Sequence, residues 1–320
     1  MNSSEMVTKA VAGDRLAIAR LLSLIEDGGP LLGDAMKQIF PLTRNAYTIG
    51  ITGAPGAGKS TLTEALVTQV RQEGIKVAVV AIDPSSPFTG GALLGDRVRM
   101  QRHATDQGVF IRSMATRGHL GGVSLATPEA IRVLDASGHD LIIVETVGVG
   151  QAEVEIVETA DTVLVVLNPG WGDGVQAGKA GLLEIGDVFV INKADREGTK
   201  QAVADIVQML RFRVEVEHRE LPWTPPVRET IATDGVGIRE LWAAIKGHRM
   251  YLENSGELQQ RRRARLFREI SDIVSESVRQ RIEREAKSEL ELLVNRVEQK
   301  ELDPYAAAQQ LLDKLEPNGR

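Results

Sequence analysis

The sequence predicts an α/β fold with a mainly parallel β-sheet. Between residues 44 and 252, short apolar runs rich in β-branched residues alternate with stretches of helical periodicity. Near-continuous apolar strands that alternate with helices are typical of a parallel sheet buried on both faces. A glycine-rich loop also separates the first run from the helix after it. The chain has 320 residues, of which 42% are hydrophobic, so it can bury a full core.

Residues 1–43 are predicted to form a helical extension before the sheet. Apolar residues recur at helical spacing from Ile18 to Ile25, and Gly28-Gly29-Pro30 ends that pattern. A second short helical segment is expected at Leu31–Ile39. The extension therefore precedes the sheet domain as a small helical unit.

Apolar runs within residues 44–252 are the expected strands of the sheet domain. In such sheets, ligands bind beyond the carboxyl ends of the strands, so the residues directly after each run are candidates for a binding site. The runs are Tyr47–Thr52, Val77–Ile82, Val109–Ile111, Leu141–Val144, Val163–Leu167, Val188–Ile191 and Val227–Glu229.

The loop after the first run has the composition of a phosphate cradle. Gly53 and Gly58 permit backbone angles that turn successive N–H groups toward one anion. Lys59 adds a positive charge for the β- and γ-phosphates, Ser60 offers a hydroxyl to Mg²⁺, and the helix N-terminus adds its partial positive charge. The alternative, a glycine-rich turn before an ordinary helix, is disfavoured by the flanking strand and helix. The predicted phosphate-binding residues are Gly53, Ala54, Pro55, Gly56, Ala57, Gly58, Lys59, Ser60 and Thr61.

Carboxylates follow the second run and the glycine-rich stretch beyond it. Asp83 falls at the ligand edge of the sheet and suits a Mg²⁺ shell, although an ordinary Asp-Pro turn is an equal alternative. The stretch from Phe88 to Asp96 is expected to sense the nucleotide. Within it, Asp96 is expected to reach the metal ion or the γ-phosphate, with a solvated helix start as the alternative.

The fourth run ends in a carboxylate, like a Walker B strand. Glu145 closes this run, and Gly148 is expected to sense the γ-phosphate through its backbone N–H. Glu145 stands where many GTPases have Asp, and its longer side chain favours contact with Mg²⁺ through a water. Gln151 can orient the attacking water. The predicted catalytic residues are Lys59, Glu145, Asp83, Asp96 and Gln151, and the predicted metal ligands are Ser60, Asp83, Asp96 and Glu145.

The segment after the sixth run indicates which nucleotide binds. Asp195 can accept hydrogen bonds from the N1–H and the exocyclic amine of guanine, a donor pair that adenine lacks. Asn192 is expected to help hold the base edge and its loop, and Lys193 is expected to lie over the ring. The loop after the last run is expected to close over the base through Ile231, Ala232 and Thr233. The predicted ligands are therefore GTP and GDP with Mg²⁺.

Residues 253–320 are predicted to form a C-terminal helical arm. Between Gly256 and Pro304 the chain has neither glycine nor proline, and an apolar stripe at helical spacing runs from Leu266 to Val297. A turn near Lys287-Ser288 can fold this arm into a hairpin. Because such a stripe needs a partner surface, we expect a homodimer through these helices, with packing back onto the sheet domain as the alternative.

Composition excludes several classes of function. The net charge of −6 supplies no general basic field for nucleic acid or an anionic membrane. Cysteine is absent, which removes disulfides, thiol nucleophiles and cysteine-built metal sites. The N-terminus lacks the pattern of a secretory signal, and no run of 18 apolar residues occurs in the sequence. We therefore expect a cytoplasmic protein that binds neither nucleic acid nor membrane.

These motifs together resemble a known family over nearly the whole chain. They are GAPGAGKST at Gly53–Thr61, AIDPSSPFTGGALLGDR at Ala81–Arg97, SMATRGHLGG at Ser113–Gly122, ETVGVGQ at Glu145–Gln151 and NKAD at Asn192–Asp195. In this combination the chain resembles the G-protein chaperones associated with methylmalonyl-CoA mutase, a family once described as a lysine/arginine/ornithine transport kinase. The resemblance implies a SIMIBI-class P-loop GTPase.

The resemblance also implies a function. In such a protein, GTP binding and slow hydrolysis would gate adenosylcobalamin loading of methylmalonyl-CoA mutase and protect or reactivate that enzyme. It implies that Ser60, Asp83, Asp96 and Glu145 form the Mg²⁺ and switch network, that the loop from Asp173 to Lys179 faces the mutase, and that the C-terminal helices dimerise.

Other functions remain open from the sequence. They are a small-molecule kinase or ATPase linked to basic amino-acid transport, a GTPase chaperone of another cobalamin-dependent mutase, and a metal-insertion GTPase. Guanine selectivity counts against the kinase, and the lack of cysteine and of paired histidines counts against metal insertion. No arginine stands out as a transition-state finger, so we expect hydrolysis to be slow until a partner completes the site.

Overall fold

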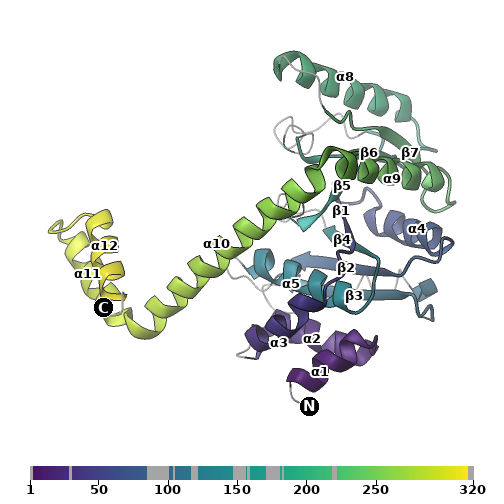
Figure 1. Cartoon of the computed structure of the whole chain (residues 1–320). Coiled ribbons are helices and arrows are strands. Elements are labelled where there is room, and N and C mark those ends of the chain that lie inside the picture. The colour runs from purple at the N-terminus through teal and green to yellow at the C-terminus, as the bar shows by residue number, and fades with distance from the viewer. Residues whose placement is uncertain are drawn as a thin grey trace. The chain divides into compact units, whose positions relative to one another are not determined.

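The structure is a computed structural model of the whole chain (Figure 1). It describes residues 3–28, 31–84, 101–103, 105–116, 122–146, 156, 159–170, 181, 184–217 and 222–315. The chain divides into two compact units, Met1–Arg265 and Leu266–Arg320. The first unit contains the sheet and the helices that cover it, and the described residues of the second unit are mainly helical.

The sheet is parallel, and each of its strands contains one of the expected apolar runs. Its 7 strands lie in the order β3-β2-β4-β1-β5-β6-β7, and every pair of neighbours in this order is parallel. The α/β fold with a mainly parallel sheet is thus confirmed. The strands are β1 (Tyr47–Gly53), β2 (Val77–Pro84), β3 (Val109–Thr116), β4 (Leu141–Thr146), β5 (Thr162–Leu167), β6 (Val188–Asn192) and β7 (Val227–Thr230).

Strand β3 is longer than its apolar run. The sequence indicated only Val109–Ile111, because Arg112 and Ser113 interrupt the apolar pattern. Nevertheless β3 pairs with β2 along its whole length, up to Thr116. Arg112 lies on the face of the sheet that α2 covers, where its Nη2 donates to Glu26 Oε2 of α2 at 2.5 Å, so the polar side chain is accommodated by an ion pair.

Alternate residues of the central strands build a core on each face of the sheet. In β4, Leu141 and Ile143 contact one core, whereas Ile142 and Val144 contact the other. Strand side chains alternate between the faces with a period of two, so a strand that is apolar at every position must be covered on both sides. All residues of β4 are buried, as this requires.

Helices cover the two faces unequally. Helices α4 and α9 pack on the face that Leu141 and Ile143 contact, and α1, α2, α3, α5 and α8 contribute to the other core. The first-unit helices are α1 (Ser3–Val11), α2 (Arg15–Asp27), α3 (Leu32–Ile39), α4 (Lys59–Arg71), α5 (Gly122–Ala136), α8 (Thr199–Glu217) and α9 (Ile238–Ser255), with short 3-10 helices at Phe40–Leu42 and Gln101–His103.

The N-terminal extension is helical, and α2 and α3 correspond to the segments that the sequence indicated, whereas α1 was not predicted as a separate helix. Asp14 caps α2 by accepting a hydrogen bond from Ala17 N at 2.8 Å, and Gly28 ends the helix in the left-handed region at φ 63°. Figure 1 shows α1, α2 and α3 lying beside α5. The apolar residues of α2 belong to the same core as those of α5, so these helices complete the cover on one face of the sheet.

Helix α10 (Glu257–Glu285) begins in the first unit and continues into the second. A single residue, Ala286, separates the end of α10 from the start of α11 (Lys287–Glu298), so the long helical stretch is interrupted near the predicted turn. A third helix, α12 (Pro304–Leu315), packs on α11 through a small core of Ala286, Leu293, Leu311 and Leu315. The earlier residues of the apolar stripe are exposed: Phe267 is 76% and Ile270 62% accessible.

Buried carboxylates hold the first turns of α10 against the edge of the sheet where the strands begin. Asp161, which is 1% exposed, accepts a hydrogen bond from Thr48 N at 3.0 Å and one from Arg262 Nη2 at 2.7 Å, and it pairs with Arg265 as well. Burial raises the pKa of Asp161, but the two guanidinium groups outweigh it and hold that pKa below its ordinary value.

Asp187 has the same role at the start of β6 that Asp161 has at the start of β5. Its carboxylate accepts from Val163 N at 2.9 Å and from Arg261 Nη1 at 3.1 Å. His248 of α9 lies beside it, with Nε2 at 3.3 Å from Asp187 Oδ1. Burial lowers the pKa of His248, opposed by the nearby Asp187 charge. The ring is therefore neutral at neutral pH, and this contact is polar rather than ionic.

Replacing Asp161 should destabilise the first unit strongly. The Asp161→Asn change removes the charge that two partly buried arginines share, and the loss of one partner from a buried ion pair costs about 3–5 kcal/mol. We expect a lower thermal unfolding midpoint by circular dichroism at pH 7. Asp34→Asn is the matched control, because Asp34 and Lys37 form an exposed pair and such pairs contribute about 0–1 kcal/mol.

The difference between these variants should depend on pH. The folded-state pKa of Asp161 is lowered from 3.8. Its charge therefore contributes stability that is complete above the unfolded-state pKa and is lost as pH falls through the lower folded-state value. Equal midpoints for wild type and Asp161→Asn at pH 7 would contradict this role.

Candidate nucleotide-binding site

The glycine-rich loop joins β1 to α4 at the edge of the sheet where the strands end. Gly53 has φ 134°, and a Cβ there would lie 2.0 Å from Val166 O of the neighbouring strand. Gly58 has φ 90°, and its Cβ would lie 2.5 Å from Asn192 Nδ2. The loop thus packs too closely for any side chain at these positions. The loop leads directly into the N-terminus of α4, and a glycine-rich loop before a helix N-terminus is an arrangement that binds phosphate.

Lys59 is buried at the first position of α4. Its side chain is bent back over the loop, where Nζ donates to Gly53 O at 2.7 Å and to Ala54 O at 3.2 Å. The residue is 6% exposed. A positive charge is therefore held within the loop itself, beside the N–H groups, as the predicted phosphate contact requires.

The structure brings together two of the predicted metal ligands, which come from different elements. Ser60 Oγ, in the first turn of α4, donates to Glu145 Oε1 at 2.5 Å. Glu145 belongs to β4 and is 3% exposed. A hydroxyl has one hydrogen and two lone pairs, so a serine oxygen that gives its hydrogen to a carboxylate retains lone pairs for a cation. The pair fits the chemistry of a Mg²⁺ site.

Asp83 reaches the same edge from the neighbouring strand. Ala81 of β2 pairs with Glu145 of β4, and β2 continues for three residues beyond that pairing. The backbone of Asp83 thus lies at the end of the strand next to Glu145. Parallel pairing is what places these two residues, 62 positions apart in the chain, at one edge.

Asn192 connects the phosphate loop to the loop after β7. Its Nδ2 donates to Ala57 O at 2.9 Å, and its Oδ1 accepts from Thr230 Oγ1 at 3.1 Å and Ala232 N at 3.2 Å. The side chain is 2% exposed. These bonds use the amide to hold the two loops together. Asn192 therefore acts here on the loops, which was one half of its predicted role.

Lys193 and Asp195 follow at the surface. Lys193 has φ 59°, unusual for a residue other than glycine, and its Nζ donates to Gly56 O at 2.7 Å. Asp195 is exposed in the turn that follows. The hydrogen bond from Ala194 N to Thr230 O at 3.1 Å holds this turn against the end of β7. The carboxylate of Asp195 is thus accessible to a ligand at the same edge as the phosphate loop.

The loop after β7 lies beside this turn. Ala232 is 8% exposed, Ile231 is half-buried and Thr233 is exposed. Ile231 and Val236 form an isolated antiparallel bridge that closes the loop. The residues predicted to cover the base are therefore brought next to Asn192, through the bond from Ala232 N to its side chain.

Some predicted residues lie outside the stretches that the structure describes: Asp96, Gly148, Gln151 and the loop from Asp173 to Lys179. One residue of the site was missed at the level of the sequence: Thr63, which donates to Glu145 Oε2 at 2.8 Å. Thr230, which begins the loop expected to close over the base, donates to Asn192 Oδ1. The position of Thr63, one helical turn after Ser60, is a signal that could have indicated it.

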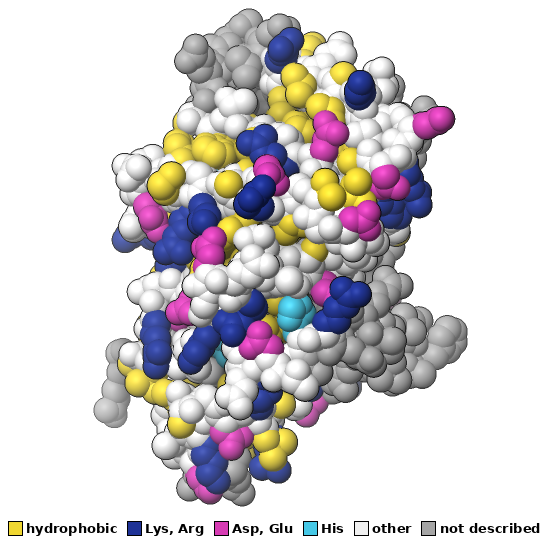
Figure 2. All heavy atoms as spheres, turned by 90° about the vertical axis from the view of Figure 1, so that its right-hand side faces the viewer, with side chains coloured by type: hydrophobic (Ala, Val, Ile, Leu, Met, Phe, Trp, Pro, Cys, Tyr) yellow, Lys and Arg dark blue, Asp and Glu magenta, His cyan; other side chains and the backbone are white. Residues whose placement is uncertain are grey.

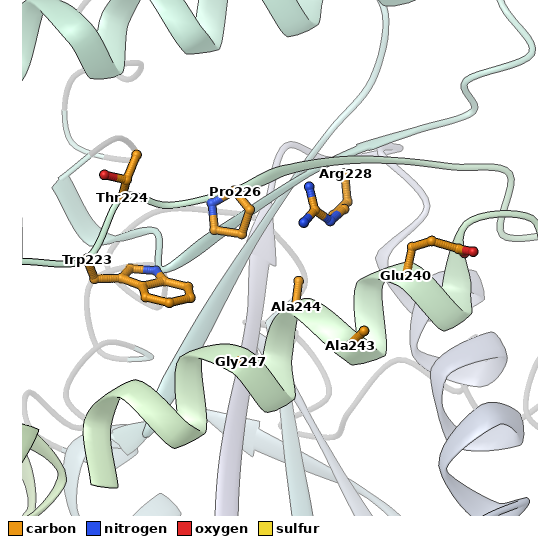
Figure 3. A pocket seen from close by; sticks show the side chains of 8 residues that line it. All are labelled: Trp223, Thr224, Pro226, Arg228, Glu240, Ala243, Ala244 and Gly247. Atoms are coloured by element: carbon orange, nitrogen blue, oxygen red, sulfur yellow. The ribbon is translucent and has the colours of Figure 1, made fainter. Parts of the chain in front are cut away.

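A cavity of about 600 Å³ lies elsewhere, between the β7 segment and α9 (Figure 3). The Trp223 ring, Pro226 and Arg228 line one side of it, and Ala244 and Glu240 of α9 line the other. None of its lining residues belongs to the phosphate loop or to Asn192–Asp195. The cavity is therefore separate from the candidate nucleotide-binding site.

Charge is mixed over the face shown in Figure 2, where Lys and Arg side chains stand among Asp and Glu side chains. With a net charge of −6 for the whole chain, we expect a phosphate ligand to be held by local groups such as Lys59 and the helix N-terminus rather than by a general basic field. Among the described residues, no helix is long and apolar enough to span a bilayer.

Comparison with known proteins agrees with this geometry. The family model for the methylmalonyl-CoA mutase-associated GTPase MeaB matches residues 18–287. A Pyrococcus abyssi protein with a provisional GTPase name is 55% identical over 97% of this chain and 96% of its own length. The mitochondrial methylmalonic aciduria type A homolog of Mus musculus is 31% identical over 96% of this chain and 78% of its own length.

The fold is shared with a solved structure as well. The crystal structure of an LAO/AO transport system kinase aligns with a TM-score of 0.70 and 28% sequence identity, over 98% of both chains. Family match, relatives and fold agree with the strand–loop–helix arrangement at Gly53–Ser60. The chain therefore belongs to the MeaB family of methylmalonyl-CoA mutase-associated GTPases and is a P-loop GTPase.

Proposed function

We propose that this GTPase is a chaperone of methylmalonyl-CoA mutase whose GTP cycle gates the loading of adenosylcobalamin and protects or reactivates the enzyme. The family model, named for association with that mutase, supports the choice of client. The name of the mouse relative, which refers to methylmalonic aciduria, points the same way. The structural observation that carries the nucleotide-binding part of the proposal is the buried Asn192 side chain, which forms hydrogen bonds with both the phosphate loop and the loop after β7.

In the proposed site the nucleotide lies across the edge where the strands end. The backbone N–H groups of residues 53–61 and the Lys59 ammonium bind the phosphates. Asp195 accepts the N1–H and amine hydrogens of guanine, while Lys193 and the loop 231–233 border the base. Support comes from the exposed position of Asp195 and from the bonds of Asn192, which fix the spacing between phosphate loop and base loop.

Ser60 and Glu145 hold Mg²⁺ in this proposal, with Asp83 and Asp96 completing the network. The support is that the Ser60 hydroxyl gives its hydrogen to Glu145, which leaves its lone pairs for the cation. A magnesium ion supplies positive charge to the β- and γ-phosphate oxygens when it is bound. Gly148 and Gln151 are proposed to sense the γ-phosphate and to orient the attacking water.

The same site suits slow GTP hydrolysis that a partner accelerates rather than fast turnover. Among the described residues, the side chains that we place at the phosphate loop are Lys59, Ser60, Glu145, Asn192 and Lys193, and none of them is an arginine. A missing finger costs about 10³–10⁵ in rate, so hydrolysis is slow until the mutase engages. Another cobalamin-dependent mutase is the alternative client.

A kinase acting in basic amino-acid transport is the second candidate, since a solved structure of similar fold is named an LAO/AO transport system kinase. It would need no preference for guanine. Competition of labelled GDP with unlabelled ADP separates the two functions, because equal affinities would favour the kinase.

Replacing Asp195 should change the base preference. With Asp195→Asn, the amide presents an N–H donor to the N1–H and amine of guanine, and each unsatisfied buried group costs about 1–3 kcal/mol. We expect GDP affinity to fall by roughly 10–100-fold, while the affinity for xanthosine diphosphate, which has a carbonyl oxygen in place of the amine, rises. Titration calorimetry with both nucleotides measures this.

Asp205→Asn, in α8, is the control for that substitution, since Asp205 Oδ1 accepts from Gln201 Nε2 at 2.7 Å within the same helix. It should leave both affinities unchanged. If Asp195→Asn retained wild-type GDP affinity, the guanine assignment would be wrong.

Mixing the protein with methylmalonyl-CoA mutase should accelerate GTP turnover and yield a complex on size-exclusion chromatography. The reason is that the partner completes a site that lacks an arginine finger among its described residues. The Lys59→Ala variant should lose both tight GTP binding and the acceleration, whereas Lys37→Ala, at an exposed position of α3, should behave as wild type. Neither a complex nor acceleration with wild type would exclude this mutase as the client.

The exposed apolar stripe of α10 supports the proposed homodimer. Burying Phe267 and Ile270 against a second copy would contribute about 25 cal/mol per Å² of apolar surface removed from water. The double variant Phe267→Asp, Ile270→Asp should therefore sediment as a monomer where the wild type sediments as a dimer. Gln280→Asp, at an exposed polar position of the same helix, is the control. A wild type that is monomeric at micromolar concentration would contradict the dimer.

A further inference from the structure

Thr63 is a fully buried hydroxyl in the second turn of α4, beside the proposed metal site. It is 0% exposed. Its Oγ1 lies 2.8 Å from Glu145 Oε2 and 3.0 Å from Lys59 O, the carbonyl four residues earlier in the helix. One hydroxyl hydrogen faces two acceptors. The carboxylate is both the nearer and the charged one, and hydrogen bonds to charged acceptors are about twice as strong as neutral ones.

Each oxygen of Glu145 thus accepts a hydrogen bond from a hydroxyl of the same helix. Ser60 donates to Oε1 and Thr63 to Oε2. Residues three positions apart lie on the same face of a helix, so both hydroxyls can meet one carboxylate. The terminal torsion of a glutamate side chain has a broad, soft profile. Each hydrogen bond to a carboxylate oxygen restricts rotation about this torsion, so the bond from Thr63 adds to the constraint that Ser60 provides.

We propose that Thr63 is a positioning residue for the magnesium site of this GTPase, an inference that rests on the proposed role of Ser60 and Glu145. By binding Oε2, Thr63 fixes the plane of the Glu145 carboxylate. That plane decides where Oε1 lies, and Oε1 receives the Ser60 hydrogen. The direction of the Ser60 lone pairs follows from where its hydrogen points. Thr63 therefore orients the Ser60 oxygen toward a cation without touching the cation itself.

An ordinary helical threonine offers a contrast within the same helix. Thr68 Oγ1 donates to Glu64 O at 2.9 Å, the same bond to the carbonyl four residues back, and the hydroxyl lies at the surface. Such bonds are common for threonine in helices and carry no ligand chemistry. Thr68 Oγ1 also lies 3.2 Å from His103 Nε2, so each threonine has one contact outside its own helix. Thr63 differs from Thr68 in that this contact is a buried carboxylate, so the two residues form a matched pair for an experiment.

The test measures how Mg²⁺ slows the release of fluorescently labelled GDP. Thr63→Val keeps the shape of the side chain and removes the hydroxyl, and the loss of such an outer partner typically costs about 10–100-fold in metal affinity. The Mg²⁺ concentration for half of the effect should therefore rise by at least about tenfold. Thr63→Ser, which restores the hydroxyl, should return it close to wild type, and Thr68→Val should leave it unchanged.

A second measurement separates positioning from damage to the fold. GDP affinity in EDTA reports on the phosphate loop without metal, and it should be the same in wild type, Thr63→Val and Thr68→Val. If GDP release from Thr63→Val depended on Mg²⁺ as it does in the wild type, the positioning role of Thr63 would be overturned. The proposed metal site at Ser60 and Glu145 would be unaffected by that result. If Thr63→Val weakened GDP binding in EDTA by the same factor by which it raised the Mg²⁺ concentration for half of the effect, Thr63 would have only a structural role.

One result for the wild-type protein would contradict the proposed metal site itself. A wild-type protein that binds GDP in EDTA but whose GDP release ignores Mg²⁺ would overturn the metal site at Ser60 and Glu145, and the role of Thr63 with it. Thr63→Ser behaving like Thr63→Val would also overturn the proposal, because the hydroxyl would then not be what matters.

Discussion

The candidate site depends on one buried amide. Asn192 donates to the phosphate loop at Ala57 O and accepts from the backbone of Ala232. These loops follow β1 and β7, which are separated in the sheet by β5 and β6. A single side chain therefore sets the spacing between the phosphate-binding and base-binding ends of the proposed site. A Cβ at Gly58 would collide with the Nδ2 of this amide, so the loop and the amide fit only with glycine there.

The two edges of the sheet use carboxylates in opposite ways. Where the strands begin, Asp161 and Asp187 are buried and accept hydrogen bonds from arginines and backbone N–H groups, and they hold the first turns of α10, as far as Arg265, against the sheet. Where the strands end, Glu145 accepts from the hydroxyls of Ser60 and Thr63, and Asp195 is exposed. The carboxylates at the first edge pair with arginines of α10, whereas Glu145 at the second edge contacts the Ser60 hydroxyl, which we propose as a metal ligand. The ligand chemistry that we propose therefore belongs to the second edge.

Local patterns in the sequence predicted most of the fold. The apolar runs indicated the strands, because a strand buried on both faces must be apolar at successive positions. Strand β3 was underestimated because Arg112 interrupts its apolar pattern and pairs with Glu26, a contact between residues far apart in the chain. Phosphate-loop residues were equally predictable, since Gly53, Gly58 and Lys59 are close together in the chain and their geometry is set locally.

The sequence by itself thus determined the α/β fold class, the phosphate loop and the identities of the residues at the strand ends. Only the tertiary structure decided which of them meet. Ser60 and Glu145 are 85 positions apart and Asn192 and Ala57 are 135 apart, and both contacts exist because parallel pairing brings every strand end to one edge. In the sequence, Thr63 cannot be distinguished from other helical threonines. Only the fold brings the Glu145 carboxylate of β4 within hydrogen-bond distance of its hydroxyl. Hydrogen bonds act over about 3 Å, so a site assembled from distant segments is defined by packing and not by spacing along the chain.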